Sequence, residues 1–197
     1  MNLLVLGPQG AGKGTQAKRI SSNYEVPHIA TGDMFRAAIA AGTPLGRQVA
    51  PLLADGILVP DELTVSLIRE RLSEDDTGAG FVLDGFPRNL TQARELDDML
   101  REIGRELDAI LFFDVPDSVS MERALRRAGI ENRSDDTREV IARRLVTYHT
   151  ETEAVVEHYR TTGKLVPIHA ARSVEEVWRE VEASLRQVEA SQLKGTV

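Results

Sequence analysis

The chain has 197 residues, of which 42% are hydrophobic and 28% charged, and its formal net charge is −7. These values are ordinary for one globular domain with its own core. The absence of cysteine excludes disulfides and thiolate metal sites, and no apolar run reaches the roughly 18 residues of a membrane span. We therefore expect a cytoplasmic protein that binds no membrane and, given its acidic balance, no nucleic acid.

An apolar run at residues 3–6 predicts a buried strand, and a loop with four glycines and one lysine, Lys13, follows it. Glycines let successive backbone N–H groups point inward, the start of a helix offers a positive pole, and a lysine reaches outer phosphates as a point charge. The loop therefore predicts binding of a nucleoside triphosphate. Gly14 stands where this motif usually has a hydroxyl, which arrives one residue later at Thr15, so the magnesium ligand stays open. A glycine-rich turn without a ligand is the alternative.

After this loop, short apolar runs alternate with helical segments. Further strands are predicted at residues 26–30, 80–84, 109–115 and 164–169. Helices are predicted at residues 13–24, 31–41, 45–55, 61–72, 90–103, 118–128 and 137–160 and from residue 173 onward. This alternation predicts an α/β fold with a five-stranded parallel sheet covered on both faces. The helical hairpin after the second strand and the loop at residues 129–136 contribute little to a sheet and are expected to cover the site.

Several single positions carry their own expectations. Thr31 and Asp61 are each placed to cap the helix that follows. Asp84 ends the third strand, at the edge where parallel sheets bind ligands, and Arg88 follows within the same loop. Trp178 belongs to a helical apolar stripe and is expected to pack in the core. The histidines lack metal-ligand spacing and receive no chemical role; they are His28, His149, His158 and His169.

Six segments together resemble one known family. GPQGAGKGT, TGDMFR, LVPDEL, DGFPRNLTQA, NRSDDT and the helix holding Arg143 and Arg144 occur in this order across nearly the whole chain and resemble the motifs of adenylate kinases. The resemblance implies a P-loop NTPase fold of three α/β/α layers with a helical AMP-binding insertion and a short lid. It also implies reversible, Mg²⁺-dependent, direct in-line phosphoryl transfer from ATP to AMP, which gives two ADP.

The resemblance further implies a single kinase domain over residues 1–197. Its core comprises residues 1–29, 60–125 and 137–190, with the AMP-binding insertion at about 30–59, the lid at about 126–136 and a frayed tail at 191–197. Only AGIEN separates Arg127 from Arg133, so the long lid insertion of other members, which sometimes binds zinc, is missing and no structural zinc is expected. The expected partners are the small molecules ATP, AMP and ADP, and the expected state is a monomer.

The family motifs assign roles residue by residue. The residues expected to bind ATP are Gly10, Ala11, Gly12, Lys13, Gly14, Thr15, Arg123, Arg127 and Arg172. Those expected to bind AMP are Thr31, Arg36, Ile57, Val59, Gly85, Arg88, Gln92, Arg133 and Arg144. The expected catalytic residues are Lys13, Arg88, Arg123, Arg127, Arg133 and Arg144.

These arginines suit phosphoryl transfer because that reaction needs alignment and charge stabilisation, so no side-chain nucleophile is required. No residue is expected to bind the metal directly; Asp84 is expected to reach Mg²⁺ through water. Asp135 and Asp136 resemble lid carboxylates that pair with arginines or contact ATP. An arginine on a helix could instead be a solvated surface residue, and Asp135 could cap the helix that starts near Thr137.

Two other functions compete with this interpretation. Kinases of UMP and CMP share the fold but typically have alanine at the position of Thr31 and asparagine at that of Gln92, so this chain favours AMP. A nucleotide-dependent switch without turnover is the second, and the converging arginines argue against it.

Three places depart from the family pattern. Pro8-Gln9 stands where many relatives have a small residue and then proline, Ala30 where serine is common, and Asn132 where glycine is usual. Asparagine tolerates left-handed backbone geometry better than other residues, so lid motion is expected to change without being abolished. The pattern gives Gln9 no role.

Overall fold

The computed structural model describes residues 1–131, 133 and 135–195. Its sheet consists of β1 (Asn2–Leu6), β2 (His28–Ala30), β3 (Phe81–Asp84), β4 (Ala109–Asp114) and β5 (Leu165–His169). All neighbouring strands are parallel, in the order β2-β3-β1-β4-β5, which confirms the predicted five-stranded sheet. Because β1 is central, the loop that follows it leaves the sheet at the middle of its carboxyl edge.

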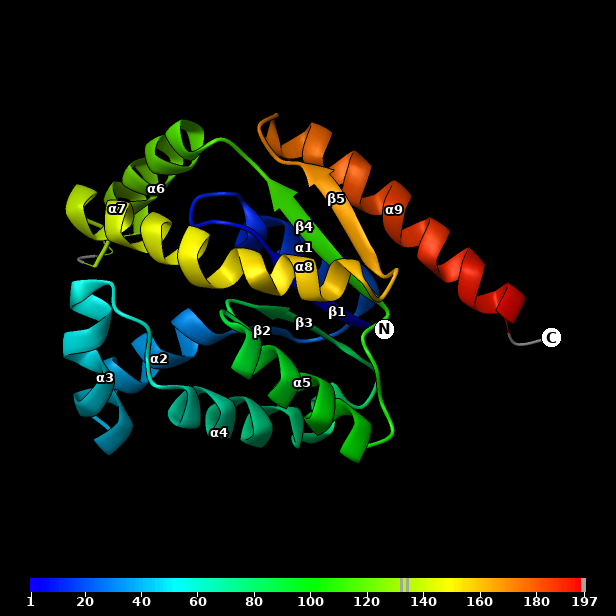
Figure 1. Cartoon of the computed structure of the whole chain (residues 1–197), viewed down its shortest axis with the longest axis horizontal. Coiled ribbons are helices and arrows are strands. Elements are labelled where there is room, and N and C mark those ends of the chain that lie inside the picture. Colours follow the sequence, from blue (N-terminus) through cyan, green and yellow to red (C-terminus); the bar gives the residue numbers. More distant parts are fainter. Residues whose placement is uncertain (132, 134, 196–197) are drawn as a thin grey trace.

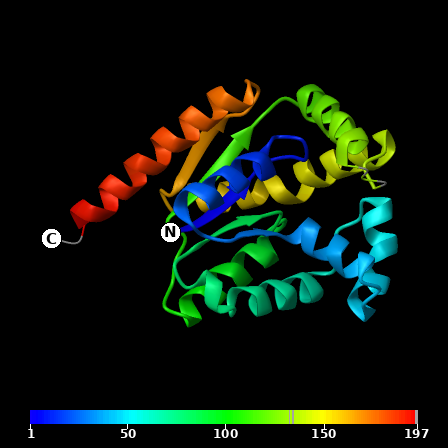
Figure 2. The same cartoon turned by 180° about the vertical axis from the view of Figure 1, so that it is seen from behind.

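The helices form two layers around this sheet (Figures 1 and 2). They are α1 (Lys13–Tyr24), α2 (Thr31–Ala40), α3 (Pro44–Asp55), α4 (Asp61–Leu72), α5 (Leu90–Glu102), α6 (Asp117–Glu131), α7 (Arg138–Thr147), α8 (Glu153–Arg160) and α9 (Val174–Gly195), with a 3-10 turn at Asp75–Thr77. Helices α1 and α9 pack on one face of the sheet, and α4, α5 and α8 pack on the other. This is the predicted three-layer α/β/α arrangement.

Successive residues of the central strands point alternately into the two hydrophobic cores, one on each face of the sheet. Leu4 and Leu83 point into the core under α4, α5 and α8, whereas Leu3 and Val82 point into the core under α1 and α9. A strand buried on both faces needs a continuous apolar run, which is why these strands were readable from sequence. Trp178 packs against the core under α1 and α9, as predicted.

The α2–α3 hairpin and the α6–α7 pair each have a small apolar cluster of their own. Phe35 and Val49 of the hairpin are buried together with Val59 of the segment that follows it, and Ala124 and Ile141 are buried between α6 and α7. Leu63 and Leu67 of α4 also pack on the hairpin cluster. Both clusters are separate from the two cores of the sheet, so each pair of helices holds together through contacts of its own.

Two expected helix caps are wrong, because tertiary hydrogen bonds engage the side chains concerned. Ala30, and not Thr31, caps α2, and the Thr31 hydroxyl donates instead to the Asp84 carbonyl oxygen at 3.4 Å. Pro60 caps α4, and the Asp61 carboxylate accepts a hydrogen bond from the Gln92 amide at 2.7 Å. Strand β2 also begins two residues later than expected, at His28.

The segments after β4 differ from the expected pattern in three respects. Helix α6 continues to Glu131, past the expected start of a loop at residue 129. The single helix expected over residues 137–160 is divided into α7 and α8 by a π-helical turn at Tyr148–Thr152. Helix α9 continues to Gly195, past the expected onset of fraying at 191. The departure at Asn132 lies outside the described residues, as do residues 134, 196 and 197.

Helix α9 is the longest helix at 22 residues, but it is amphipathic, with Val177, Val181 and Leu185 on the sheet. No described helix combines the length and apolar character that crossing a membrane requires.

Truncation of Leu96 tests the core under α5. Leu96 is fully buried, so Leu96→Ala should lower the free energy of unfolding by about 2–5 kcal/mol through lost burial and a residual cavity. Leu90, at the start of the same helix, is 36% exposed. The matched variant Leu90→Ala should therefore change the free energy of unfolding by less than about 1 kcal/mol. Urea unfolding followed by circular dichroism measures both. Equal losses would contradict the assignment of Leu96 to the core.

Candidate active site

A cavity of about 830 Å³ opens at the carboxyl ends of the strands. The loop after β1, the α2–α3 hairpin, the end of β3, helices α6 and α7 and the start of α9 all contribute to its walls. Nearly every residue to which the sequence assigned a role lines it. Those residues are Gly10, Ala11, Gly12, Lys13, Gly14, Thr15, Thr31, Arg36, Ile57, Val59, Asp84, Gly85, Arg88, Arg123, Arg127, Arg133, Arg144 and Arg172. Gln92, Asp135 and Asp136 do not line it; Gln92 is buried directly behind Arg88, and both carboxylates pair with Arg144.

The phosphate loop (residues 7–15) turns the start of α1 toward the cavity. Gly12 caps this helix in a left-handed conformation with φ 90°, and no side chain caps the helix. The first N–H groups of α1 therefore face the cavity at the positive end of the helix dipole, where an anion binds. A side chain at Gly10 would overlap the Ser120 carbonyl oxygen, so only glycine lets the loop lie this close to α6.

Lys13 extends over the phosphate loop and donates to the carbonyl oxygens of Gly7 and Pro8, at 2.8 Å each. Burial, together with the charges of Arg88 and Arg127, lowers the pKa of Lys13 to about 8 against the opposing effect of Asp84. A cation held this way gains stability from an anion entering the cavity.

Asp84 lies at the end of β3, opposite the start of α1. Burial acts to raise the pKa of this carboxyl, but contact with His28, whose Nε2 is 3.5 Å from Oδ2, and the charge of Lys13 outweigh it and lower the pKa. Asp84 is therefore ionised at neutral pH. A Cβ at Gly14 would stand 3.4 Å from the Asp84 carboxylate, so a longer side chain there would fill the space beside it.

Carboxylates pair with most arginines of the cavity. The Asp136 carboxylate, which is completely buried, accepts from Arg127 at 2.6 Å and from Arg144 at 2.8 Å. Asp135 accepts from Arg144 at 2.8 Å and lies 3.7 Å from Arg36. These pairs confine guanidinium groups that would otherwise repel one another, and they do so with the planar geometry that suits phosphate oxygens equally well.

Two more carboxylates extend this network. Asp33 pairs with Arg36 at 2.5 Å and lies 3.5 Å from Arg133, which also pairs with Glu131 at 2.6 Å. Arg123 differs, because it donates to the backbone oxygens of Ala170 and Arg172 in the segment between β5 and α9. Arg123 is therefore held by backbone oxygens and not by a carboxylate.

Arg88 has no carboxylate within ion-pair distance among the described residues, and the backbone around it is fixed instead. Its Nε donates to the Gly85 carbonyl oxygen, its backbone N–H donates to Gln92 Oε1, and its carbonyl oxygen accepts from the Thr152 hydroxyl, each at 2.8 Å. Burial and the charge of Arg144 lower the pKa of Arg88 to about 10. Arg88 is thus a desolvated cation in a rigid setting.

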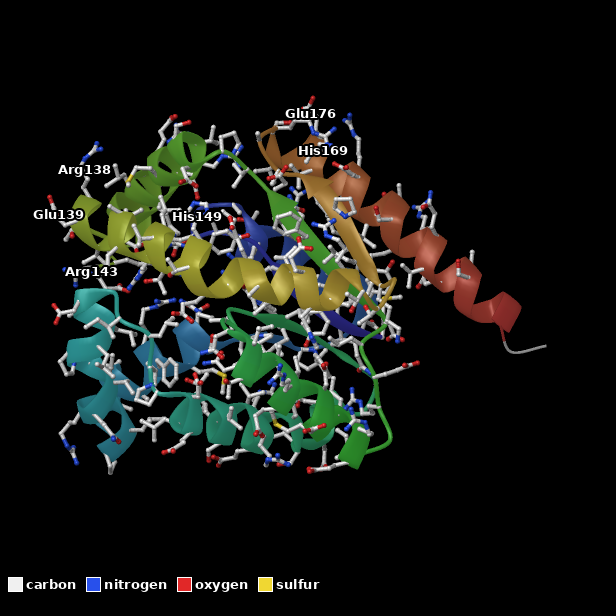
Figure 3. All side chains as sticks on the ribbon, viewed as in Figure 1. Arg138, Glu139, Arg143, His149, His169 and Glu176 are labelled. Carbon is white, nitrogen blue, oxygen red and sulfur yellow. The ribbon has the colours of Figure 1, made fainter. Side chains whose placement is uncertain are left out.

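Helix α7 contacts the end of α3, across the mouth of the cavity. Arg143 Nη1 donates to the Asp55 carbonyl oxygen, and Arg144 Nη2 donates to the Leu53 carbonyl oxygen at 3.0 Å. Figure 3 shows Arg143 between the two helices. The hairpin and the arginine-bearing helix therefore close over the same space.

The comparison with known families agrees with this geometry. The family model for adenylate kinase matches residues 5–164. The chain belongs to the adenylate kinase family. It is 45% identical to the adenylate kinase of Thermobifida fusca over 94% of this chain and 98% of that protein. It is 38% identical to the adenylate kinase of Archaeoglobus fulgidus over 96% of this chain and 100% of that protein. It is 43% identical to the adenylate kinase of a Cyanothece species over 97% of this chain and 98% of that protein.

Membership of the family establishes the reaction. As an adenylate kinase, the enzyme is a nucleoside monophosphate kinase and catalyses ATP + AMP = 2 ADP, with ATP used together with Mg²⁺. Without cysteine, the chain has no thiolate with which to build a zinc site. Within residues 1–131, 133 and 135–195, no three His, Cys, Asp or Glu side chains are grouped to hold a metal directly.

Sequence reasoning missed several residues of this adenylate kinase site. His28 lines the cavity beside Asp84, and Asp33 pairs with two cavity arginines, although neither received a role. Asp61 holds the Gln92 amide, and Thr152 holds the loop of Arg88. His28 and Thr152 have no local sequence signal, because each acts through a partner that is distant in the chain. Asp33 and Asp61 stand within the motifs TGDMFR and LVPDEL, but these motifs do not show that Asp33 pairs with Arg36 or that Asp61 binds the Gln92 amide.

The lowered pKa of Lys13 predicts a proton uptake. Above about pH 8 a growing fraction of Lys13 is neutral in the free enzyme, whereas bound phosphates raise its pKa and restore the charge. ATP binding should therefore take up protons near pH 9 but not near pH 6.5. Isothermal titration calorimetry in two buffers of different ionisation enthalpy measures this uptake.

Lys13→Arg stays charged throughout this range and should lose the uptake, while Lys164→Met, at the opposite edge of the sheet, should keep it. The same uptake in Lys13→Arg and the unaltered enzyme would assign the proton to another group.

Proposed function

We propose that the phosphate loop holds ATP, the α2–α3 hairpin and the Arg88 loop hold AMP, and the arginines between them stabilise the phosphoryl group in transit. The single observation that supports this assignment is that all three sets of residues line one cavity. The proposed ATP-binding residues are Gly10, Ala11, Gly12, Lys13, Gly14, Thr15, Arg123, Arg127 and Arg172.

Transfer itself requires no protein nucleophile in this proposal. The α1 N–H groups and Lys13 bind the donor phosphates, and Arg88 and Arg36 orient the acceptor phosphate, so that donor and acceptor oxygens lie in line. Arg123, Arg127, Arg133 and Arg144 then surround the transferring group. Phosphate oxygens would take the place of Asp135 beside Arg144 and would join Asp136 as partners of Arg127 and Arg144, so little new ordering of these arginines is needed.

Base selection for AMP is proposed to involve Thr31, Ile57, Val59, Gly85 and Gln92. Thr31 and Gly85 are in close contact on the cavity wall, since a Cβ at Gly85 would stand 2.7 Å from Thr31 Oγ1. The Gln92 amide uses one lone pair to accept from Arg88 and one N–H to donate to Asp61, so its second N–H and second lone pair could pair with adenine. Gln92 thereby links recognition of the base to the position of Arg88.

Asp84 suits the proposed water-mediated contact with Mg²⁺. It is ionised, lines the cavity and faces the start of α1 beside Gly14. Mg²⁺ held near Asp84 would supply positive charge that offsets the charge of the donor phosphates. Asp84 would orient the waters of that ion, while Lys13 restrains the carboxylate from the other side.

Residues 30–59 and about 126–136 are proposed to be the moving parts of a single domain. The hairpin and the α6–α7 pair each have their own apolar cluster, so either can shift while the sheet keeps its cores. We also propose that the enzyme acts as a cytoplasmic monomer, because its nucleotide site is complete within one chain.

A panel of monophosphates tests base selection. With ATP and Mg²⁺, AMP should form ADP at least about ten-fold faster than CMP or UMP forms its diphosphate, since a pyrimidine leaves Gln92 or Thr31 with an unpaired group. Coupled or chromatographic measurement of the diphosphates gives the rates. Gln92→Asn should lower the ratio of the rate with AMP to the rates with CMP and UMP. Equal turnover of all three would remove the base-reading role from these residues.

Arg88→Ala tests the acceptor site. It should lower kcat by about a thousand-fold or more, because it removes a desolvated cation from the transferring charge. Arg94, exposed on α5, provides the matched control, and Arg94→Ala should leave kcat within about two-fold. Far-UV circular dichroism and melting should remain near normal for both. If Arg88→Ala loses activity only in proportion to unfolding, its role is structural.

A further inference from the structure

Gln9 connects the phosphate loop to the arginine network of α6 and α7. Its amide Nε2 donates to Asp136 Oδ1 at 2.7 Å, and its Oε1 accepts from Arg144 Nη1 at 3.4 Å. Its backbone oxygen is anchored separately by the Ser120 hydroxyl at the start of α6. Among the described residues, no other side chain of the phosphate loop bonds to this network.

The carboxylate that Gln9 contacts has a special position. Asp136 has no exposed surface and joins Arg127 of α6 to Arg144 of α7. A buried carboxylate between two guanidiniums fixes both, and any shift of it displaces them together. The Gln9 contact therefore sets where this pair of arginines stands relative to the loop that binds the ATP phosphates.

An amide is the group that fits this place. Gln9 must donate to a carboxylate and accept from a guanidinium at the same time, which a primary amide does without adding charge. Glutamate would oppose a second carboxylate to Asp136, lysine could only donate, and an apolar side chain would leave the buried Asp136 short of one donor.

We infer that Gln9 is a positioning residue for phosphoryl transfer, which holds Arg127 and Arg144 in register with the phosphate loop through Asp136. This inference rests on the proposed roles of the two arginines. Gln9 acts by limiting the arrangements that Arg127 and Arg144 can adopt, so its contribution belongs to the transfer step and not to the binding of ATP.

Single-turnover transfer from ATP to AMP, followed by rapid quench at saturating nucleotide, tests the inference. Gln9→Ala and the isosteric Gln9→Glu should each lower the transfer rate by about ten-fold, the usual effect of losing a hydrogen bond to a charged group. The matched variant Gln187→Ala, exposed on α9, should stay within about two-fold. A transfer rate for Gln9→Ala within two-fold of the unaltered enzyme would overturn the inference.

Two further readouts separate positioning from a general structural role. The KM for ATP should change by less than about three-fold in Gln9→Ala, and the melting temperature should stay within a few degrees, because the side chain is only half-buried. In an Asp136→Asn background, Gln9→Ala should cost less than about three-fold, because the path through the carboxylate is already weakened. A full ten-fold loss in that background would show that Gln9 acts elsewhere. If Asp136→Asn does not fold, the two single variants of Gln9 decide the matter.

Arg127→Ala separates this inference from the proposed function. If Arg127→Ala lowers the transfer rate by about a thousand-fold while Gln9→Ala stays within about two-fold of the unaltered enzyme, only the positioning role of Gln9 fails. If Arg127→Ala leaves transfer unchanged, the assigned roles of the arginines fail, and the inference fails with them.

Discussion

Repulsion among cations gathered in one partly desolvated cavity is the constraint on which the rest of this structure depends. Guanidiniums from α2, α6 and α7 converge with Lys13 on a space where water screens them poorly. Ion pairs with Asp33, Asp135 and Asp136 offset this repulsion for most of the guanidiniums. Lys13 and Arg88 are held by backbone oxygens instead, and burial together with the neighbouring cations lowers their pKa values. A polyphosphate is the natural complement of such a site, because one ligand brings enough charge for several cations.

The same constraint implies that the site favours ligands of high charge. A small monovalent anion cannot compensate Arg144 for the loss of Asp135, since it returns one charge and fewer oriented acceptors. A phosphoryl group supplies several oxygens in a fixed arrangement. The internal carboxylates therefore order the arginines and also raise the charge that a ligand must carry before it displaces them.

Much of this fold was predictable because its signals are local. Strands buried on both faces require uninterrupted apolar runs, and the turn from β1 into α1 requires glycines, so residues 3–15 predict both the strand and a phosphate site. The partners of Gln92, Asp61 and Thr152 were not predictable, because each lies on another element. Thr31 illustrates the limit: its type suits a helix cap, yet the nearby Asp84 carbonyl engages its hydroxyl. The family resemblance supplied which arginines matter, and the network that restrains them required the structure.

The π-helical turn at Tyr148–Thr152 changes which directions the side chains of α7 and α8 face relative to each other. One long helix was expected because residues 137–160 contain few helix breakers, and Ile141, Leu145 and Val156 also keep α-helical spacing. Yet Ile141 faces α6, whereas Val156 faces the sheet. A π turn takes up one residue more than an α turn and rotates the faces on its two sides by about 100°, so both ends reach their neighbours. The number of residues between Arg144 and α8, more than their identity, therefore keeps the arginine aimed at the cavity while the far end stays anchored.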